Sequence, residues 1–163
     1  MYMINKNGFL YKYVYNGMEK AYFCVTHHSE KADDTFSKSF DFFEKEVPLT
    51  ESSIEDIYNI NFYVYWDCGI EKVDAKWNVP VSKTWMDGEK VKLEHEGHLP
   101  GWNIDEKYLC SKYVDKREIE QYAIEFQYLV KDGVKLEQEY VDEKIVSRQE
   151  FEALFEKYMN ENI

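Results

Sequence analysis

The fold class is decided by residues 121–140, QYAIEFQYLVKDGVKLEQEY. From Tyr122 to Val130 nearly every second residue is aromatic or aliphatic, and the residues between them are mostly Gln and Glu. Side chains of a strand point alternately to opposite faces, so this pattern predicts a half-buried strand. The alternation resumes at Val134, beyond a turn at residues 131–133, which predicts a second strand and therefore a β-hairpin.

The length of this turn determines which residues of the two strands face each other. A two-residue Asp132-Gly133 turn would place Val130 opposite Lys135 and would set carboxylates against the aromatic face. A three-residue loop at positions 131–133, with Gly133 in the left-handed conformation, would pair apolar residues with apolar residues. The pattern therefore predicts the three-residue loop.

A helix is predicted directly after the hairpin. Ser147 and Glu150 have the spacing of a capping box, in which the Ser147 hydroxyl accepts a hydrogen bond from the Glu150 backbone N–H. Apolar residues then recur at helical spacing, namely Phe151, Leu154, Phe155, Tyr158 and Met159. Such a stripe must be buried, and the Tyr/Ile/Phe face of the hairpin is the obvious partner. The sequence thus predicts a C-terminal amphipathic helix packed on one face of an antiparallel sheet.

Further strands are predicted along the rest of the chain. Runs rich in aromatic and β-branched residues cover positions 9–15, 18–25, 61–67, 73–79, 82–86, 89–95 and 108–114. The first two runs flank Asn16-Gly17, a dipeptide typical of a two-residue hairpin turn. The pattern is looser at 73–79 and 108–114, so these runs together with the final hairpin predict a mainly antiparallel sheet of about 6–8 strands arranged as hairpins.

Two short helices are also expected between these strands. Three phenylalanines at helical spacing follow Asp34, and an apolar set with the same spacing follows Thr50; the two sets are Phe36, Phe40 and Phe43, and Ile54, Ile57 and Tyr58. The complete prediction is an α+β fold with an antiparallel sheet, two short helices and the C-terminal helix.

Length and composition predict a single α+β domain over residues 1–163, because no Pro/Gly/Ser-rich linker divides the chain. Its three widely spaced cysteines favour reduced thiols over a disulfide framework or a zinc site. No apolar run reaches the roughly 18 residues of a membrane helix, and the N-terminus lacks the features of a signal peptide. We therefore expect a cytoplasmic protein without a cofactor.

The formal net charge of −12 argues against direct nucleic-acid binding, which requires clustered Lys and Arg. The same charge suits a partner protein with a basic surface. The expected interface is the outer face of the final hairpin, where the preferred register gathers Glu125, Glu137 and Glu139, with Gln127 beside them. An ordinary solvated sheet face is the other explanation for these carboxylates.

Motifs for catalysis are absent from the sequence. There is no glycine-rich phosphate-binding loop, and the cysteines lie in or beside predicted strands, where a thiol behaves as a small apolar group. His95 and His98 are one residue closer than the helical His-Glu-x-x-His pattern requires, so no metal site is predicted. A small-molecule pocket is the second candidate site, and its expected residues are Trp77, Trp85, His95, His98 and Trp102.

Two hypotheses of function follow from these observations. The first is a non-catalytic acidic binding protein that blocks a basic surface of a protein partner, as inhibitors, immunity proteins and phage anti-defence proteins do. The alternative is a binding protein or hydrolase for a small molecule or nucleotide derivative, using the segment from Trp77 to Trp102. Catalysis is not expected under the first hypothesis.

Overall fold

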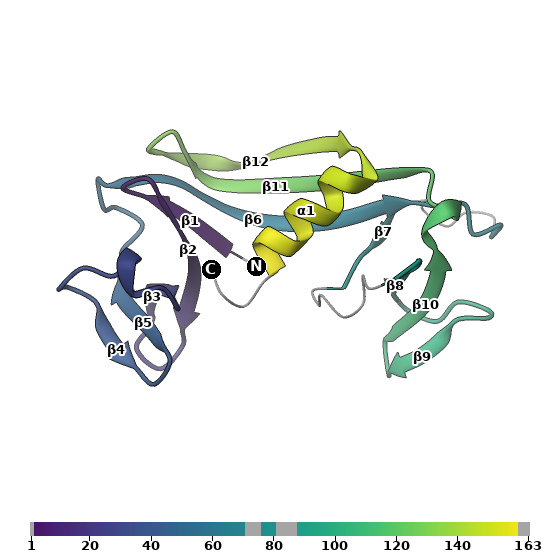
Figure 1. Ribbon diagram of the computed structural model, residues 1–163, viewed down its shortest axis with the longest axis horizontal. Helices are drawn as coiled ribbons and strands as arrows, with labels where there is room; N and C mark the ends of the chain where they lie inside the picture. Colours follow the sequence, from purple (N-terminus) through teal and green to yellow (C-terminus); the bar gives the residue numbers. More distant parts are fainter. Residues whose placement is uncertain (1, 71–75, 81–87, 160–163) are drawn as a thin grey trace. The chain divides into compact units, whose positions relative to one another are not determined.

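The computed structural model describes residues 2–70, 76–80 and 88–159, which form a mainly antiparallel β-structure (Figure 1). Twelve described strands belong to one hydrogen-bonded sheet, and the helix α1 (Arg148–Met159) follows the last of them. The described residues also form two 3₁₀ turns, η1 (Ser29–Lys31) and η3 (Lys116–Glu118). The antiparallel sheet with a C-terminal helix is confirmed, whereas the described residues form more strands and fewer helices than predicted.

Contacts divide the chain into two compact units, which are described separately. One contains residues 2–60 and 126–142, and the other contains the described residues within 61–125 and 143–159. Three long strands belong partly to each unit: β6 (Ile54–Tyr65), β11 (Gln121–Lys131) and β12 (Val134–Val146).

The first unit is built mainly from neighbouring antiparallel strands. Its pairs are β1 (Tyr2–Lys6) with β2 (Phe9–Asn16), β2 with β3 (Ala21–Thr26), β3 with β5 (Phe42–Glu46), and β5 with β4 (Ser37–Ser39). Strand β1 also pairs with the beginning of β6. The hairpin predicted around Asn16-Gly17 is therefore present as β2 and β3.

The turn between β2 and β3 is longer than predicted. Asn16 pairs with Ala21, so the connection has four residues rather than two. The Asn16 side chain accepts hydrogen bonds from the backbone N–H groups of Met18 at 3.0 Å and Glu19 at 3.4 Å. Asparagine therefore stabilises this turn through its side chain.

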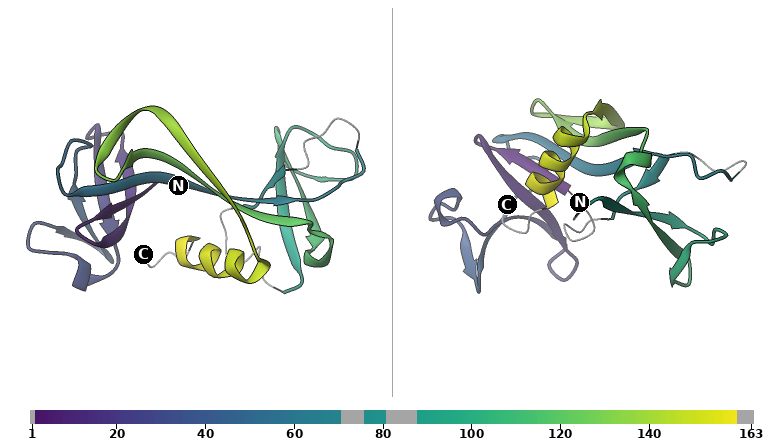
Figure 2. Two further views of the ribbon diagram at one scale, coloured as in Figure 1. Left: turned by 90° about the horizontal axis from the view of Figure 1, so that it is seen from above. Right: turned by 45° about the vertical axis from the view of Figure 1, so that its right-hand side comes forward.

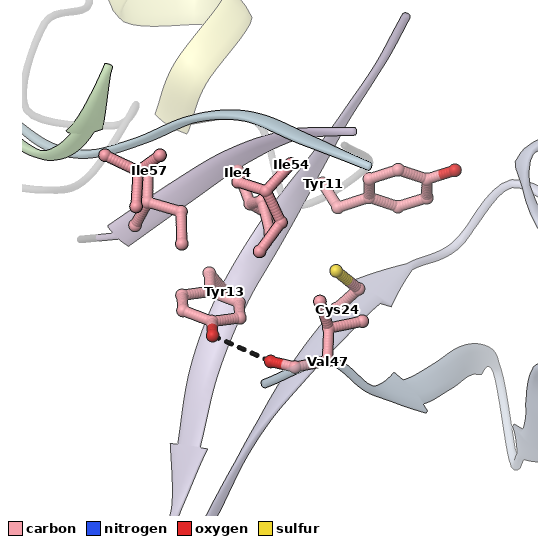
Figure 3. Close-up of a cluster of buried hydrophobic side chains, with 8 residues drawn as sticks. Ile4, Tyr11, Tyr13, Cys24, Val47, Ile54 and Ile57 are labelled. Carbon is pink, nitrogen blue, oxygen red and sulfur yellow. Dashed lines mark hydrogen bonds between the residues drawn. The ribbon is translucent and has the colours of Figure 1, made fainter. Parts of the chain in front are cut away.

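The core of the first unit lies on one face of β2 and β3 (Figure 3). Its buried members are Ile4, Tyr11, Tyr13, Cys24, Val47, Ile54, Ile57 and Val130. The Tyr13 hydroxyl donates a 2.8 Å hydrogen bond to the Val47 carbonyl, which satisfies the polar end of a buried ring. Burial also raises the pKa of the Cys24 thiol to about 12, so this cysteine stays protonated.

The short helix predicted around Phe36, Phe40 and Phe43 is wrong, because this segment contains the hairpin of β4 and β5. Phe40 lies in the turn with a φ of 44° and is 96% exposed. Phe43 of β5 instead pairs with Thr26 of β3, and the Phe36 ring stacks on that of Tyr11. Pairing with β3 therefore outweighs the helical spacing of the three rings.

The short helix predicted around Ile54 and Ile57 is also wrong, because both residues belong to β6. Asn5 of β1 pairs with Asp56, but the next residue of β1 pairs with Ile54, which leaves Glu55 as an extra residue in a β-bulge. A bulge reverses the alternation of a strand, so Ile54 and Ile57 reach the same core although they are three positions apart. The bulge thus imitates the spacing of a helix.

The second unit continues the sheet from β6. Strand β7 (Lys76–Asn78) pairs with β6, β8 (Lys90–Glu96) pairs with β7 and β10 (Leu109–Asp115), and β10 pairs with β9 (Asn103–Glu106). Strands predicted at 89–95 and 108–114 match β8 and β10. The strand predicted at 82–86 and the beginning of the one at 73–79 lie outside the described residues.

Helix α1 packs on the apolar face of the sheet within the second unit. The Phe151 ring contacts those of Phe62 and Tyr122, with centroid distances of 5.3 and 5.0 Å. At the N-terminus of the helix, the Ser147 hydroxyl accepts a 3.2 Å hydrogen bond from the Glu150 N–H. The predicted helix, the Ser147 cap and the contact of the helix with Tyr122 of the predicted face are confirmed. In the described part of the chain, no helix has both the length and the apolar character needed to cross a membrane.

Candidate functional site

The turn between β11 and β12 has two residues, so the predicted three-residue loop is wrong. Strand β11 ends at Lys131 and β12 begins at Val134. Asp132 and Gly133 have φ values of 51° and 76°, and positive φ at both central positions is the mark of a type I′ turn. The prediction assumed that β12 has a buried apolar face that must lie opposite the apolar residues of β11. Val134 of β12 is instead 61% exposed.

Strand β12 lies at an edge of the described sheet. It pairs with β11 and with no other described strand, and the two strands lie side by side in both ribbon views (Figures 1 and 2). Several of its apolar side chains are largely exposed, namely Val134, Tyr140, Val141 and Ile145. Among the described strands only β11 pairs with β12, so no described strand covers its other backbone edge, and such an edge can accept a further strand.

The four predicted interface residues have different environments. Glu137 and Glu139 are exposed on β12. Glu125 is 9% exposed, and its Oε2 lies 3.0 Å from the Lys76 ammonium. Gln127 is partly buried and accepts a hydrogen bond from an asparagine of β6. The expected grouping of Glu125 with the exposed carboxylates is wrong, because Glu125 is engaged in an ion pair inside the second unit.

Lys76 joins carboxylates from two strands. Its ammonium contacts both Glu125 and Glu143, and it lies 4.1 Å from the centre of the Tyr63 ring. Burial alone would disfavour the ammonium, but the hydrogen bonds from Lys76 to Glu143 and Glu125 raise its pKa above the ordinary value. The Tyr65 hydroxyl also donates to Glu143 at 3.0 Å. Sequence patterns missed this cluster because β7, β11 and β12 supply its charged members.

Some residues of the second candidate site come together in the core of the second unit. The Trp77 ring lies 4.9 Å from that of Trp102 and 5.4 Å from that of His95, measured between centroids. Trp77 and Trp102 are only 1% and 7% exposed, so they pack as core residues. His98 is exposed, with Nε2 3.1 Å from the Lys107 carbonyl oxygen. Trp85 lies outside the described residues.

His95 has one unusual atom. Its Nδ1 is buried and makes no hydrogen bond to any described residue. Burying an unsatisfied polar atom costs roughly 1–3 kcal/mol, so a ligand with a complementary group would gain by meeting it. Among the described residues, no group of three or more His, Cys, Asp and Glu side chains could hold a metal ion.

The first unit contains a surface hollow that was not predicted. It has a volume of about 600 Å³ and lies over β2, β3 and β5. Four apolar side chains of these strands line it, namely Val14, Phe23, Val25 and Phe42, and Glu44 is its only charged lining residue among those described. The available sequence signal was the presence of apolar residues on both faces of the β2–β3 hairpin.

Comparison of the chain with family models, curated proteins and solved structures gives no match. The geometry described above is therefore the basis for the proposals that follow.

Proposed function

We propose that the protein is a non-catalytic acidic binding protein that covers a basic surface of a partner protein, in the manner of an inhibitor or immunity protein. The observation that carries this proposal is the pair of exposed carboxylates, Glu137 and Glu139, on the edge strand β12. A partner strand can add to such an edge through backbone hydrogen bonds. Lys and Arg side chains on that partner would complement the carboxylates, which favours rapid and specific association.

The same carboxylates disfavour the pairing of β12 with a second copy of itself. In an antiparallel pair, like charges directly opposite each other are destabilising. The net charge of −12 adds a general repulsion between two copies. Charged side chains on an edge strand commonly prevent self-association, and they leave the edge open to a partner of opposite charge.

Charge reversal on β12 tests this function. The wild-type protein is panned against a displayed library of random peptides, and the enriched peptides are measured by titration against the variant Glu137→Lys/Glu139→Lys. We expect a class of enriched peptides that is rich in Lys and Arg and that loses about tenfold or more in affinity for the variant, a change of about 1.4 kcal/mol. Their affinity for the wild-type protein should fall with added salt.

The matched control is Glu96→Lys/Glu106→Lys, which makes the same change of charge at two exposed carboxylates on β8 and β9. This variant should retain the affinity of the wild-type protein. An equal loss in both variants would mean that only the net charge matters, and would rule out β12 as the contact strand. Enrichment of neutral or acidic peptides would rule out the basic partner.

A second candidate function uses the core around Trp77 and Trp102, and the unsatisfied Nδ1 of His95 is the observation that favours it. Under this alternative, a small molecule or nucleotide derivative would bind beside His95. A panel of metabolites and nucleotides should then raise the melting temperature by mass action on the folded state. The increase should be lost in His95→Phe, and the absence of an increase with every compound would reject this candidate.

A further inference from the structure

The hollow of the first unit lies on the face of β2 and β3 opposite the core. Tyr13 and Cys24 are paired neighbours that point into the core, and Val14 and Phe23 are the next pair along the strands. Because side chains alternate, Val14 and Phe23 point to the other face, where Val25 and Phe42 join them around the hollow. Folding requires only one apolar face, so the second one calls for a separate explanation.

Two apolar side chains at the hollow, those of Val14 and Met18, are open to solvent. Val14 is 48% exposed, and Met18, which lines one end of the hollow from the β2–β3 turn, is 93% exposed. Methionine has a flexible and polarisable side chain that adapts to apolar partners of different shape. An exposed methionine beside a lined hollow is therefore suited to contact with another apolar side chain.

The β5 strand places one carboxylate, Glu44, in the lining of the hollow and a second, Glu46, on the same face. Glu44 pairs with Val25 across β3 and β5, and Glu46 pairs with Phe23, so both point to the face that carries the hollow. Glu19 and Lys20 follow Met18 in the exposed turn, so the turn adds no net charge beside the hollow. Lys12 also lies on this face, opposite Val25 from the β2 side. The β5 side of the hollow is thus acidic and complements a cation that sits next to an apolar group.

We infer that this hollow is a docking site for a basic amphipathic segment of a partner protein. An aliphatic or aromatic side chain of that segment occupies the space between Val14, Phe23 and Phe42. A neighbouring Lys or Arg of the segment meets Glu44. This site is separate from β12 and does not depend on the function proposed for that strand.

Two other occupants fit the charges less well. A second copy of the chain would meet this face with the same face, since a two-fold interface is formed by the same patch on both subunits. Glu44 and Glu46 would then be brought close to their own copies. An anionic lipid surface would be repelled by a protein with a net charge of −12.

The test uses peptides enriched from the same random library on the full-length protein, titrated against variants of the hollow. We expect Val14→Ser to weaken binding about tenfold and Met18→Ser about threefold, because both remove apolar contact area. Glu44→Gln should weaken binding about fivefold at low salt and less at high salt. Met18 lies in an exposed turn, so its variant keeps the test informative if Val14→Ser is unstable.

Val141→Ser is the matched control, because Val141 is also 48% exposed on a strand but lies on β12. Peptides that bind the hollow should keep their affinity for Val141→Ser and for Glu137→Lys/Glu139→Lys. Peptides that bind β12 should show the opposite pattern, so either proposal can fail without the other.

Three outcomes would overturn the inference. One is the absence of any enriched peptide that is weakened by Val14→Ser or by Met18→Ser. Another is concentration-dependent dimerisation in sedimentation experiments that Val14→Ser abolishes, because the occupant would then be a second copy. The last is binding to phosphatidylglycerol vesicles that Val14→Ser abolishes, because the occupant would then be a lipid surface.

Discussion

At the scale of single residues, glutamates of the final hairpin have different roles because their surroundings differ. Glu137 and Glu139 are exposed, whereas Glu125 is buried against Lys76. Alternation along a strand assigns a side chain to a face, but it does not reveal what a distant strand brings to that face. The ion pair of Glu125 therefore could not be predicted from residues 121–140, and the interface proposed on β12 depends on the two exposed glutamates alone.

The variant Glu125→Gln tests this difference. It leaves Lys76 paired with Glu143 and removes a charged hydrogen bond from a buried site. We expect the free energy of unfolding to fall by about 1–3 kcal/mol, as measured by urea denaturation. Glu137→Gln, at an exposed position, should change it by less than about 0.5 kcal/mol. Equal effects of the two variants would contradict the structural role of Glu125.

Acid should weaken the fold through its paired carboxylates. Hydrogen bonds from Lys76 lower the pKa of Glu143; burial alone would raise the pKa of Glu152, but hydrogen bonds from Lys116 and Arg148 outweigh it and lower that pKa too. A lowered pKa in the folded state means that the unfolded chain takes up protons first. The stabilisation is therefore complete above the unfolded pKa of about 4.3 and is lost as the pH falls through the folded value.

Urea denaturation at a series of pH values from neutral to acid measures this loss. Glu152→Gln should be less stable than the wild-type protein at neutral pH, and the difference should shrink as the pH falls below about 4.3. A difference that stays constant across this range would show that the ion pair with Lys116 contributes nothing to the pH dependence.

At the scale of elements, prediction succeeded where the signal was local. Helix α1 was predicted because Ser147 and the apolar stripe after it lie within a single element. The segment around Phe40 and the beginning of β6 were predicted wrongly, because their conformation depends on pairing with β3 and β1. The hollow also escaped prediction, since Phe42 reaches Phe23 and Val25 only through the pairing of β5 with β3.

The turn between β11 and β12 makes a prediction about glycine. Gly133 has a φ of 76°, and a Cβ added there would lie 3.6 Å from the Ile54 carbonyl oxygen, which is an ordinary contact. The cost of Gly133→Ala is therefore conformational, and we expect the free energy of unfolding, measured by urea denaturation, to fall by about 1–2 kcal/mol. Gly17 has no positive φ and no neighbour within 4 Å, so Gly17→Ala should change stability by less than about 0.5 kcal/mol. A larger loss of stability in Gly17→Ala than in Gly133→Ala would contradict the type I′ turn.

At the scale of the whole molecule, three strands belong to both compact units. Because β6, β11 and β12 are continuous through them, we expect the two units to unfold together. Such a result would also support the single domain predicted from the length of the chain. Continuous strands transmit the loss of one core to the other, which is the physical basis of a cooperative transition.

The variant Ile57→Ala tests this cooperativity. Ile57 is fully buried in the first unit, and Trp66, Trp77 and Trp102 belong to the second. We expect tryptophan fluorescence and circular dichroism to give coincident urea transitions. Both should report a free energy of unfolding that is about 2–5 kcal/mol lower than that of the wild-type protein. If the fluorescence transition of Ile57→Ala matched that of the wild-type protein, the two units would be independent.

The burial of two thiols gives the protein a chemical property of practical use. Cys24 and Cys110 are completely buried, whereas Cys68 is partly exposed. A maleimide dye should therefore modify Cys68 in the native protein and all three cysteines in denaturant, which mass spectrometry of digested samples can verify. Without any substitution, the wild-type chain would then carry one fluorophore at a known position, ready for measurements of partner association.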